Sequence, residues 1–190
     1  MCIEIEAKLK VDSFENIESR LAGLGAQFLA QKVQRDLYFD DRNGTLAGSD
    51  RCLRLRHELS QGSEQVFLTC KGAKQKDTFK KRQEVELEIT DADSAKQLLS
   101  VLGYQPVLLV EKKRRMWQLG NCIVALDELP LLGTFVEIEG PDDREIAASQ
   151  DSLGLGQLTH IPQSYAHMAS DKLCELGRQT KDLLLEEYSE

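Results

Sequence analysis

The sequence predicts an α+β fold, in which short β-strands are combined with amphipathic helices. In "CIEIEAKLK", residues 2–10, charged and apolar residues alternate, so an extended strand would have one charged and one apolar face. A second observation is a series of helical patterns that end near glycine. A third is a faint duplication, because an acidic strand, a helix and "GLG" at 23–25 are matched by an acidic strand, a helix and "VLG" at 101–103. Two similar β–α–β halves indicate an approximate internal two-fold.

The period of two recurs in later runs, most of them rich in β-branched residues, as strands are. In "CLRLR" (52–56), Arg54 and Arg56 share one face, and Leu53 and Leu55 share the other. The further predicted strands cover residues 66–71, 82–89, 110–117, 121–129 and 135–139.

Four helices are predicted between or after these strands. Helix 13–24 would begin at Asp12 or Ser13, and helix 92–102 at Asp91 or Asp93, because aspartate and serine favour the N-cap. Gly25 and Gly103 follow these two helices as expected C-terminal glycines. The remaining helices and the predicted loops are 142–154, which has a capping box from Asp142 to Glu145, about 164–188, and loops at 40–50 and 60–64.

Length and composition favour one domain, residues 1–190, with an ordinary content of 41% apolar and 29% charged residues. No apolar run approaches the roughly 18 residues of a membrane span, and no signal-peptide pattern is found, so we expect a cytoplasmic protein without a membrane partner. Five widely spaced cysteines favour reduced thiols rather than a zinc site. The net charge of −8 argues against broad nucleic-acid binding.

The charged strand faces are sorted by sign. Acid pairs at period two occur in "EIE" (4–6), "ELE" (86–88) and "EIE" (137–139), whereas base pairs occur in "RLR" (54–56) and "KKR" (112–114). Like charges on one strand face repel unless an opposite charge lies between them. Inside a closed barrel, the acids would hold a hard divalent metal such as Mg²⁺ or Mn²⁺, and the bases would hold a polyphosphate. A sheet with a solvent-exposed charged face is the alternative. Motifs of P-loop proteins, dinucleotide-binding proteins, kinases and zinc proteases are absent.

The segment "EIEAK" at 4–8 resembles the ExExK signature of the CYTH superfamily, the triphosphate tunnel metalloenzymes. Further landmarks of that family follow in order over about residues 3–169. They are "RDLYFD" (35–40), "LRLR" (53–56), "CKG" (70–72), "RQEVELE" (82–88), "EKKR" (111–114), "ALD" (125–127), "GTFVEIE" (133–139) and "SYAHM" (164–168). As a whole, this run of motifs is most similar to bacterial proteins labelled class IV adenylyl cyclases.

The resemblance implies a closed, mostly antiparallel eight-stranded β-barrel, a tunnel fold with helices packed outside. The metal-binding acids that it implies are Glu4, Glu6, Asp127, Glu137 and Glu139. The triphosphate-binding bases that it implies are Lys8, Arg54, Arg56, Lys71, Arg82, Lys112 and Arg114. Lys71 is also the candidate catalytic base, although a phosphate ligand is the simpler role. The roles of Glu84, Glu86 and Glu88 stay open.

Two reactions fit this resemblance, namely hydrolysis of a phosphoanhydride bond and cyclisation of ATP to cyclic AMP and pyrophosphate. Both need cations that neutralise charge, a metal and in-line geometry. We favour hydrolysis, because family cyclases carry a His-Phe pair a few residues before ExExK, and no such pair precedes Glu4 here. The third alternative is a non-catalytic polyphosphate- or nucleotide-binding module. The expected partner is a small-molecule triphosphate, and a homodimer remains an open option.

Overall fold

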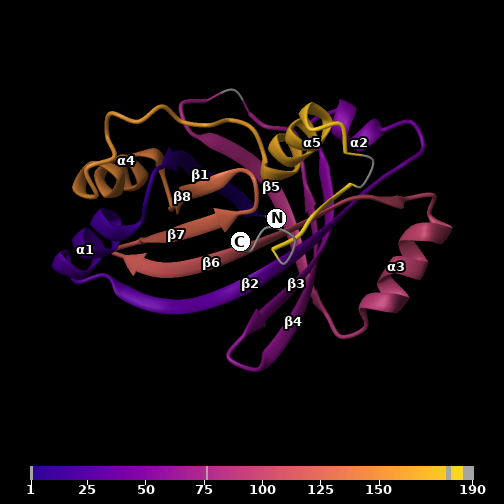
Figure 1. Ribbon diagram of the computed structural model, residues 1–190, viewed down its shortest axis with the longest axis horizontal. Coiled ribbons are helices and arrows are strands. Elements are labelled where there is room, and N and C mark those ends of the chain that lie inside the picture. Colours follow the sequence, from indigo (N-terminus) through magenta and orange to yellow (C-terminus); the bar gives the residue numbers. More distant parts are fainter. Residues whose placement is uncertain (1, 76, 179–180, 186–190) are drawn as a thin grey trace.

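Eight strands close into a barrel in the computed structural model of the protein (Figure 1), which describes residues 2–75, 77–178 and 181–185. Their order around the barrel is β2-β3-β4-β5-β1-β8-β7-β6, and β2 pairs with β6 to close it. Every one of these neighbouring pairs is antiparallel. The predicted eight-stranded barrel is therefore confirmed. The barrel strands are β1 (Cys2–Val11), β2 (Gln27–Asp40), β3 (Cys52–Ser60), β4 (Ser63–Lys71), β5 (Lys80–Ile89), β6 (Gln105–Leu119), β7 (Cys122–Leu129) and β8 (Gly133–Glu139).

The two halves of the faint duplication take equivalent places in the barrel. β1, α1 (Glu15–Gly23) and β2 form the first strand–helix–strand unit, and β5, α3 (Ala92–Val101) and β6 form the second. β1 pairs antiparallel with β5, and β2 pairs antiparallel with β6. Equivalent strands that pair in this way are what an internal two-fold would produce.

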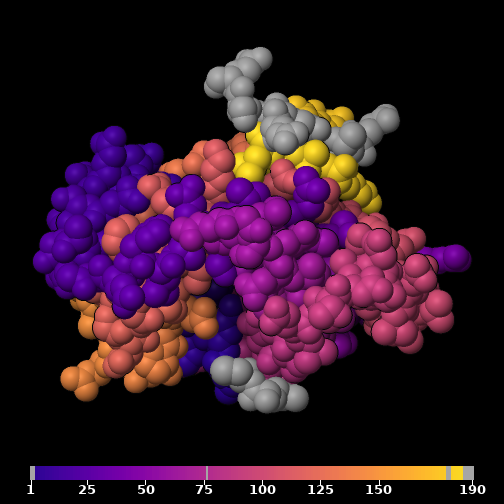
Figure 2. All heavy atoms as spheres, turned by 90° about the horizontal axis from the view of Figure 1, so that it is seen from below, coloured from indigo at the N-terminus to yellow at the C-terminus, as the bar shows by residue number. Residues whose placement is uncertain are grey.

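Helices cover the apolar outer face of the barrel. Ile17 and Leu21 of α1 and Ile146 of α4 (Asp143–Ser152) are buried with outward-facing residues of β1, β7 and β8. Leu99 of α3 packs with residues of β2, β3 and β4. Figure 2 shows α1 and α4 at one end of the molecule and α3 at the other, as does Figure 1. The alternating sequence pattern is thus explained, because apolar side chains pack under helices while charged ones face inward.

α5 (Tyr165–Glu175) packs differently, against one end of the barrel interior. Phe135 lies two residues before Glu137 on β8, and Val110 lies two residues before Lys112 on β6, so both point inward with these charged residues. Tyr165 is buried in the same apolar cluster as Phe135 and Val110. This cluster fills one end of the interior, and most of the charged inward-facing side chains lie in the remaining part.

The prediction of one long helix over residues 164–188 is wrong. α5 ends at Glu175, because Gly177 takes a left-handed backbone conformation (φ +62°) that stops the helix. The chain then forms β9 (Asp182–Leu183), which pairs in parallel with β6 outside the barrel circuit. The parts of the predicted helix that lie outside the described residues are 179–180 and 186–188.

The other predicted helix ends are partly confirmed. Asp91 and Asp142 cap α3 and α4 through side-chain acceptors, as expected. α1 instead begins after Phe14, which makes no side-chain cap hydrogen bond, so the prediction of Asp12 or Ser13 is wrong. The predicted loop 40–50 contains the short helix α2 (Thr45–Gly48).

Among the described residues, no helix has the length and apolar character needed to cross a membrane.

Candidate active site

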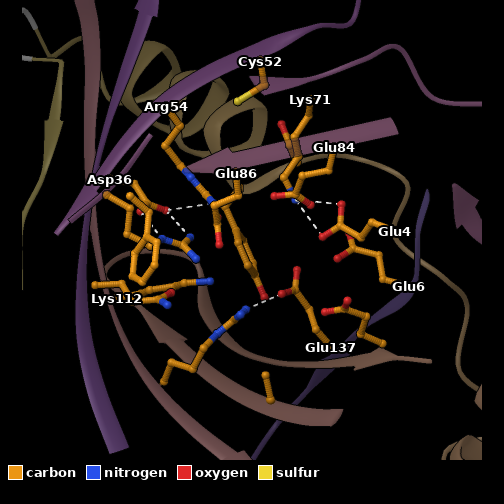
Figure 3. Close-up of a pocket in the computed structure, with 18 of the residues that line it drawn as sticks. Glu4, Glu6, Asp36, Cys52, Arg54, Lys71, Glu84, Glu86, Lys112 and Glu137 are labelled. Atoms are coloured by element: carbon orange, nitrogen blue, oxygen red, sulfur yellow. Dashed lines mark hydrogen bonds and ion pairs between the residues drawn. The ribbon is translucent and has the colours of Figure 1, made fainter. Parts of the chain in front are cut away.

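The inward-facing side chains surround a cavity of about 690 Å³, within the range of about 300–1,000 Å³ that is typical of small-molecule sites. Figure 3 shows Glu4, Glu6 and Lys71 on one side of this cavity and Asp36 and Arg54 on another. β1, β3, β4, β5, β6 and β8 each contribute residues, because alternate positions of every strand point inward. The predicted site residues that line the cavity are Glu4, Glu6, Lys8, Arg54, Arg56, Lys71, Arg82, Lys112, Arg114, Glu137 and Glu139.

On the acidic side, two lysines pair with the acids of β1. The Nζ of Lys71 lies 2.7 Å from both carboxylate oxygens of Glu4 and 3.1 Å from Glu84. Lys80 forms an ion pair with Glu6. In the antiparallel register, β5 runs beside β1, and Glu6 lies opposite Lys80. The acids of the ExExK segment are therefore neutralised by bases from β4 and β5.

Glu139 shows that negative charge is nevertheless in excess on this side. Burial, followed by the nearby carboxylates of Glu4 and Glu6, raises its pKa to about 7. A carboxyl group whose pKa is raised by neighbouring carboxylates marks a place where a cation would be stabilised.

On the basic side, Asp36 aligns two arginines of β3. Arg56 donates two hydrogen bonds to its carboxylate, at 2.6 and 2.7 Å, and Arg54 lies 3.7 Å away. Burial alone would raise the pKa of Asp36, but Arg56 and Arg54 hold it well below its usual range. Arg54 also donates to the hydroxyl of Thr69 at 3.2 Å. Asp36 lies opposite Arg56 in the β2–β3 register, so pairing of these strands sets the direction of the guanidinium groups.

Asp127 is on the inward face of β7 but is fully buried against Lys112 and Arg114, so it does not line the cavity itself. Its side chain has no exposed surface, and it accepts from Lys112 at 3.0 Å and from the Nε of Arg114 at 2.6 Å. Glu137 lines the cavity, lies 3.3 Å from Lys8 and pairs with Arg114 as well. Burial opposes its ionisation, yet Lys8 and Arg114 hold the pKa of Glu137 well below its usual range.

Burial also weakens the charge of two predicted phosphate-binding lysines. It lowers the pKa of Lys8, and burial together with Arg114 lowers the pKa of Lys112 to about 7. Arg82 lines the cavity too, where Asp50 binds it through a carboxylate oxygen at 2.9 Å.

Sequence reasoning missed several inward-facing polar residues. Lys80 stands two residues before Arg82 and could have been found by extending the alternation of β5 backwards. Asp36 is part of "RDLYFD", but only the strand pairing shows that it contacts Arg54 and Arg56. The missed lining residues also include Lys32, Gln34, Glu58 and Tyr165.

The acids on the β1 side fit a divalent cation better than the buried Asp127 does. Glu4, Glu6 and Glu139 offer carboxylate oxygens, the donors that Mg²⁺ and Mn²⁺ prefer. Within residues 2–75, 77–178 and 181–185, no three or more acidic, histidine or cysteine side chains already meet in an arrangement that could hold a metal ion. Because Lys71 and Lys80 occupy these carboxylates, a cation would have to compete with their ammonium groups.

Comparison with known proteins finds relatives that match most of the chain. A Methanocaldococcus jannaschii protein with the provisional name adenylate cyclase is 31% identical over 137 residues, 72% of this chain and 76% of its own. An Aeromonas hydrophila protein named adenylate cyclase CyaB is 28% identical over 75% of this chain and 71% of its own.

Solved structures confirm the fold. A Pyrococcus horikoshii OT3 protein superposes with a TM-score of 0.77 at 29% identity, over 89% of this chain and 99% of its own. A Hippeastrum protein superposes with a TM-score of 0.66 at 19% identity, over 97% and 99% of the two chains. It was provisionally named an adenylyl cyclase, and its reported activity is dominantly that of a triphosphatase. The CYTH domain model matches residues 2–165, and the chain therefore belongs to the CYTH family.

Proposed function

We propose that the protein is a divalent-metal-dependent enzyme that hydrolyses a phosphoanhydride bond of a triphosphate. The observation that carries the proposal is the convergence of cationic side chains from five strands on one cavity that also contains a crowded group of acids. Such a set of cations matches the distributed negative charge of a polyphosphate. The bases concerned are Lys8, Arg54, Arg56, Lys71, Arg82, Lys112 and Arg114.

The proposed division of labour follows from the contacts. Arg54 and Arg56, which Asp36 holds in place, bind phosphate oxygens with fixed guanidinium planes. Lys71 donates to Glu4 and lies 3.1 Å from Glu84, and these contacts support a role as a phosphate ligand rather than as a general base. A divalent cation bound near Glu4, Glu6 and Glu139 would supply charge neutralisation and orient the triphosphate.

Cyclisation of ATP is the second candidate, and the names of two relatives favour it. Part of the cavity lining is apolar and could contact a nucleobase, for example at Phe67, Met116 and Ile123. A cyclase must also bend the ribose toward the α-phosphorus, which requires preorganised contacts to the nucleoside. We favour hydrolysis because the charged side chains on which the proposal rests would bind only phosphate and metal.

One incubation separates these candidates. The purified protein is mixed with Mg²⁺ or Mn²⁺ and with tripolyphosphate, ATP or thiamine triphosphate, and orthophosphate, pyrophosphate and cyclic AMP are measured separately. Orthophosphate as the main product supports hydrolysis, whereas equal amounts of cyclic AMP and pyrophosphate from ATP would establish the cyclase. Binding of tripolyphosphate without turnover would indicate the non-catalytic module. Arg56→Ala is the control for contaminating phosphatases, since their activity would not respond to it.

A further inference from the structure

The ring of Tyr165 contacts two of the buried lysines in the cavity. The Nζ of Lys8 lies 3.8 Å from the ring centroid, and the Nζ of Lys112 lies 4.6 Å from it. Both distances are within the roughly 6 Å over which an aromatic face attracts a cation. Lys8 is on β1 and Lys112 is on β6, two strands that are separated in the barrel by β8 and β7. One ring therefore joins cations from two separate parts of the wall.

The position of this ring is fixed by the start of α5. Ser164 caps the helix by accepting a hydrogen bond from the backbone N–H of His167 at 3.2 Å. The Tyr165 ring packs edge-on against Phe135, with centroids 5.4 Å apart and planes at 71°. The carbonyl of Gln163, two residues before the ring, accepts a hydrogen bond from Lys8 at 3.0 Å. The same short segment thus binds Lys8 through both its backbone and its aromatic side chain.

An aromatic partner suits these lysines for an electrostatic reason. Each is 2% exposed and has an acidic partner, Glu137 for Lys8 and Asp127 for Lys112. A further carboxylate would stabilise the ammonium groups but would cancel the charge that a phosphate needs. The negative face of a ring stabilises a cation and carries no net charge.

We propose that Tyr165 is a positioning residue that orients Lys8 and Lys112 toward the triphosphate through its aromatic face. The role in substrate binding rests on the proposed function, whereas the contact between ring and lysines does not. Without the ring, each ammonium group is expected to be held by its carboxylate alone and to be less available to phosphate.

The test compares Tyr165→Leu with Tyr165→Phe. Leucine removes the aromatic face, and we expect KM for tripolyphosphate to rise about tenfold while kcat changes less than about threefold, which corresponds to about 1.4 kcal/mol of lost binding. Phenylalanine keeps the ring and should restore KM. Leu173→Ala is the matched control, because Leu173 is buried in the same cluster on the same helix but does not line the cavity. It should lower the melting temperature and leave KM unchanged.

A double variant tests whether the ring acts through Lys8. In a Lys8→Met background, Tyr165→Leu should raise KM by a smaller factor than in the wild type, because one of its two cations is already gone. An equal factor in both backgrounds would contradict the proposed route. A KM for Tyr165→Leu that matches Leu173→Ala, or a Tyr165→Phe variant as defective as Tyr165→Leu, would overturn the proposal.

A measurement without substrate separates this proposal from the proposed function. Because the Nζ atoms of Lys8 and Lys112 lie 3.8 and 4.6 Å from the ring centroid, the protons on the adjoining ε-carbons should show ring-current shifts in NMR spectra of lysine-labelled protein. Tyr165→Phe should keep these shifts and Tyr165→Leu should abolish them. If the wild type neither binds nor cleaves tripolyphosphate, the proposed function fails, and shifts that persist in Tyr165→Leu refute the ring contact independently.

Discussion

Glu137 and Glu139 provide a matched test of the charge arrangement, because they lie two residues apart on the same face of β8. Neutralising each with glutamine keeps the shape of the side chain. Glu137 contacts Lys8 and Arg114, whereas Glu139 is crowded by other carboxylates. The two variants should therefore shift the stability of the metal-free protein in opposite directions.

The expected loss of stability in Glu137→Gln can be estimated from the ion pair between Glu137 and Lys8. Two charges 3.3 Å apart interact by about 5 kcal/mol at an effective dielectric constant near 20. Loss of one partner of a buried pair costs about 3–5 kcal/mol. At about 2–4 °C per kcal/mol for a chain of this size, the melting temperature should fall by about 6–20 °C.

For Glu139→Gln the expected change in stability has the opposite sign, so this variant should be more stable than the wild type. The pKa of this carboxyl is raised to about 7, so at pH 8 the folded protein holds a charge that burial and the neighbouring carboxylates disfavour. Burial contributes to the raised pKa, but the residue as a whole still reaches solvent, so screening limits the gain to less than about 1 kcal/mol. The melting temperature should rise by up to about 4 °C.

The assay is thermal unfolding at pH 8 in EDTA, followed by turnover of tripolyphosphate with Mn²⁺. Under the proposed function, both variants should lose most activity. Glu139 is a proposed metal ligand, and Glu137 pairs with Lys8 and Arg114, two of the proposed phosphate-binding bases. A Glu137→Gln protein as stable as the wild type, or a Glu139→Gln protein destabilised to the same extent as Glu137→Gln, would refute the reasoning.

Three further outcomes are expected. Excess EDTA should abolish turnover, and full activity in EDTA would contradict a role of the acids in metal binding. Arg56→Ala should lower the turnover of tripolyphosphate by about 10²–10³-fold. Arg56→Lys should recover only part of this turnover, because lysine cannot reproduce the two hydrogen bonds to Asp36. Wild-type turnover in either variant would contradict the proposed role of Arg56 in phosphate binding. Arg56 and Arg54 hold the pKa of Asp36 low against the effect of burial, so its stabilisation is present above the pKa of an unfolded aspartate, about 4, and is lost as the pH falls below it. Urea unfolding from pH 5 to pH 2 should show a steeper loss of stability in the wild type than in Asp36→Asn, and equal slopes would contradict this.

The inward-facing residues could be predicted because the side-chain period of a strand is two. Once "EIE" and "RLR" are recognised as strands, the charged face of each follows without knowledge of its neighbours. Lys80 was missed because it lies before the predicted strand 82–89, in a run with six basic residues at 71–82, and such a run is typical of a solvated loop. The end of α5 was missed because apolar residues continue beyond Gly177, although glycine there is itself a stop signal.

The ion-pair partners could not be predicted in the same way, because they depend on register and closure. Asp36 and Arg56 are 20 residues apart and meet only because β2 and β3 pair with these residues opposite each other. Lys8 and Lys112 meet at Tyr165 only after β1, β8, β7 and β6 pair side by side and α5 packs into the end of the barrel. A sequence pattern assigns a residue to a face, but the closed sheet decides which charge it meets.

The pairing of acids with bases has a consequence for the proposed reaction. Lys71 and Lys80 neutralise Glu4 and Glu6, so a cation that binds these carboxylates releases both ammonium groups. Released ammonium groups can bind phosphate oxygens, and phosphates that hold them leave the carboxylates free for the cation. Metal and triphosphate should thus bind with positive coupling, and the coupling free energy must be the same in both directions. Such coupling would leave the cavity neutralised by its own side chains until metal and triphosphate arrive together.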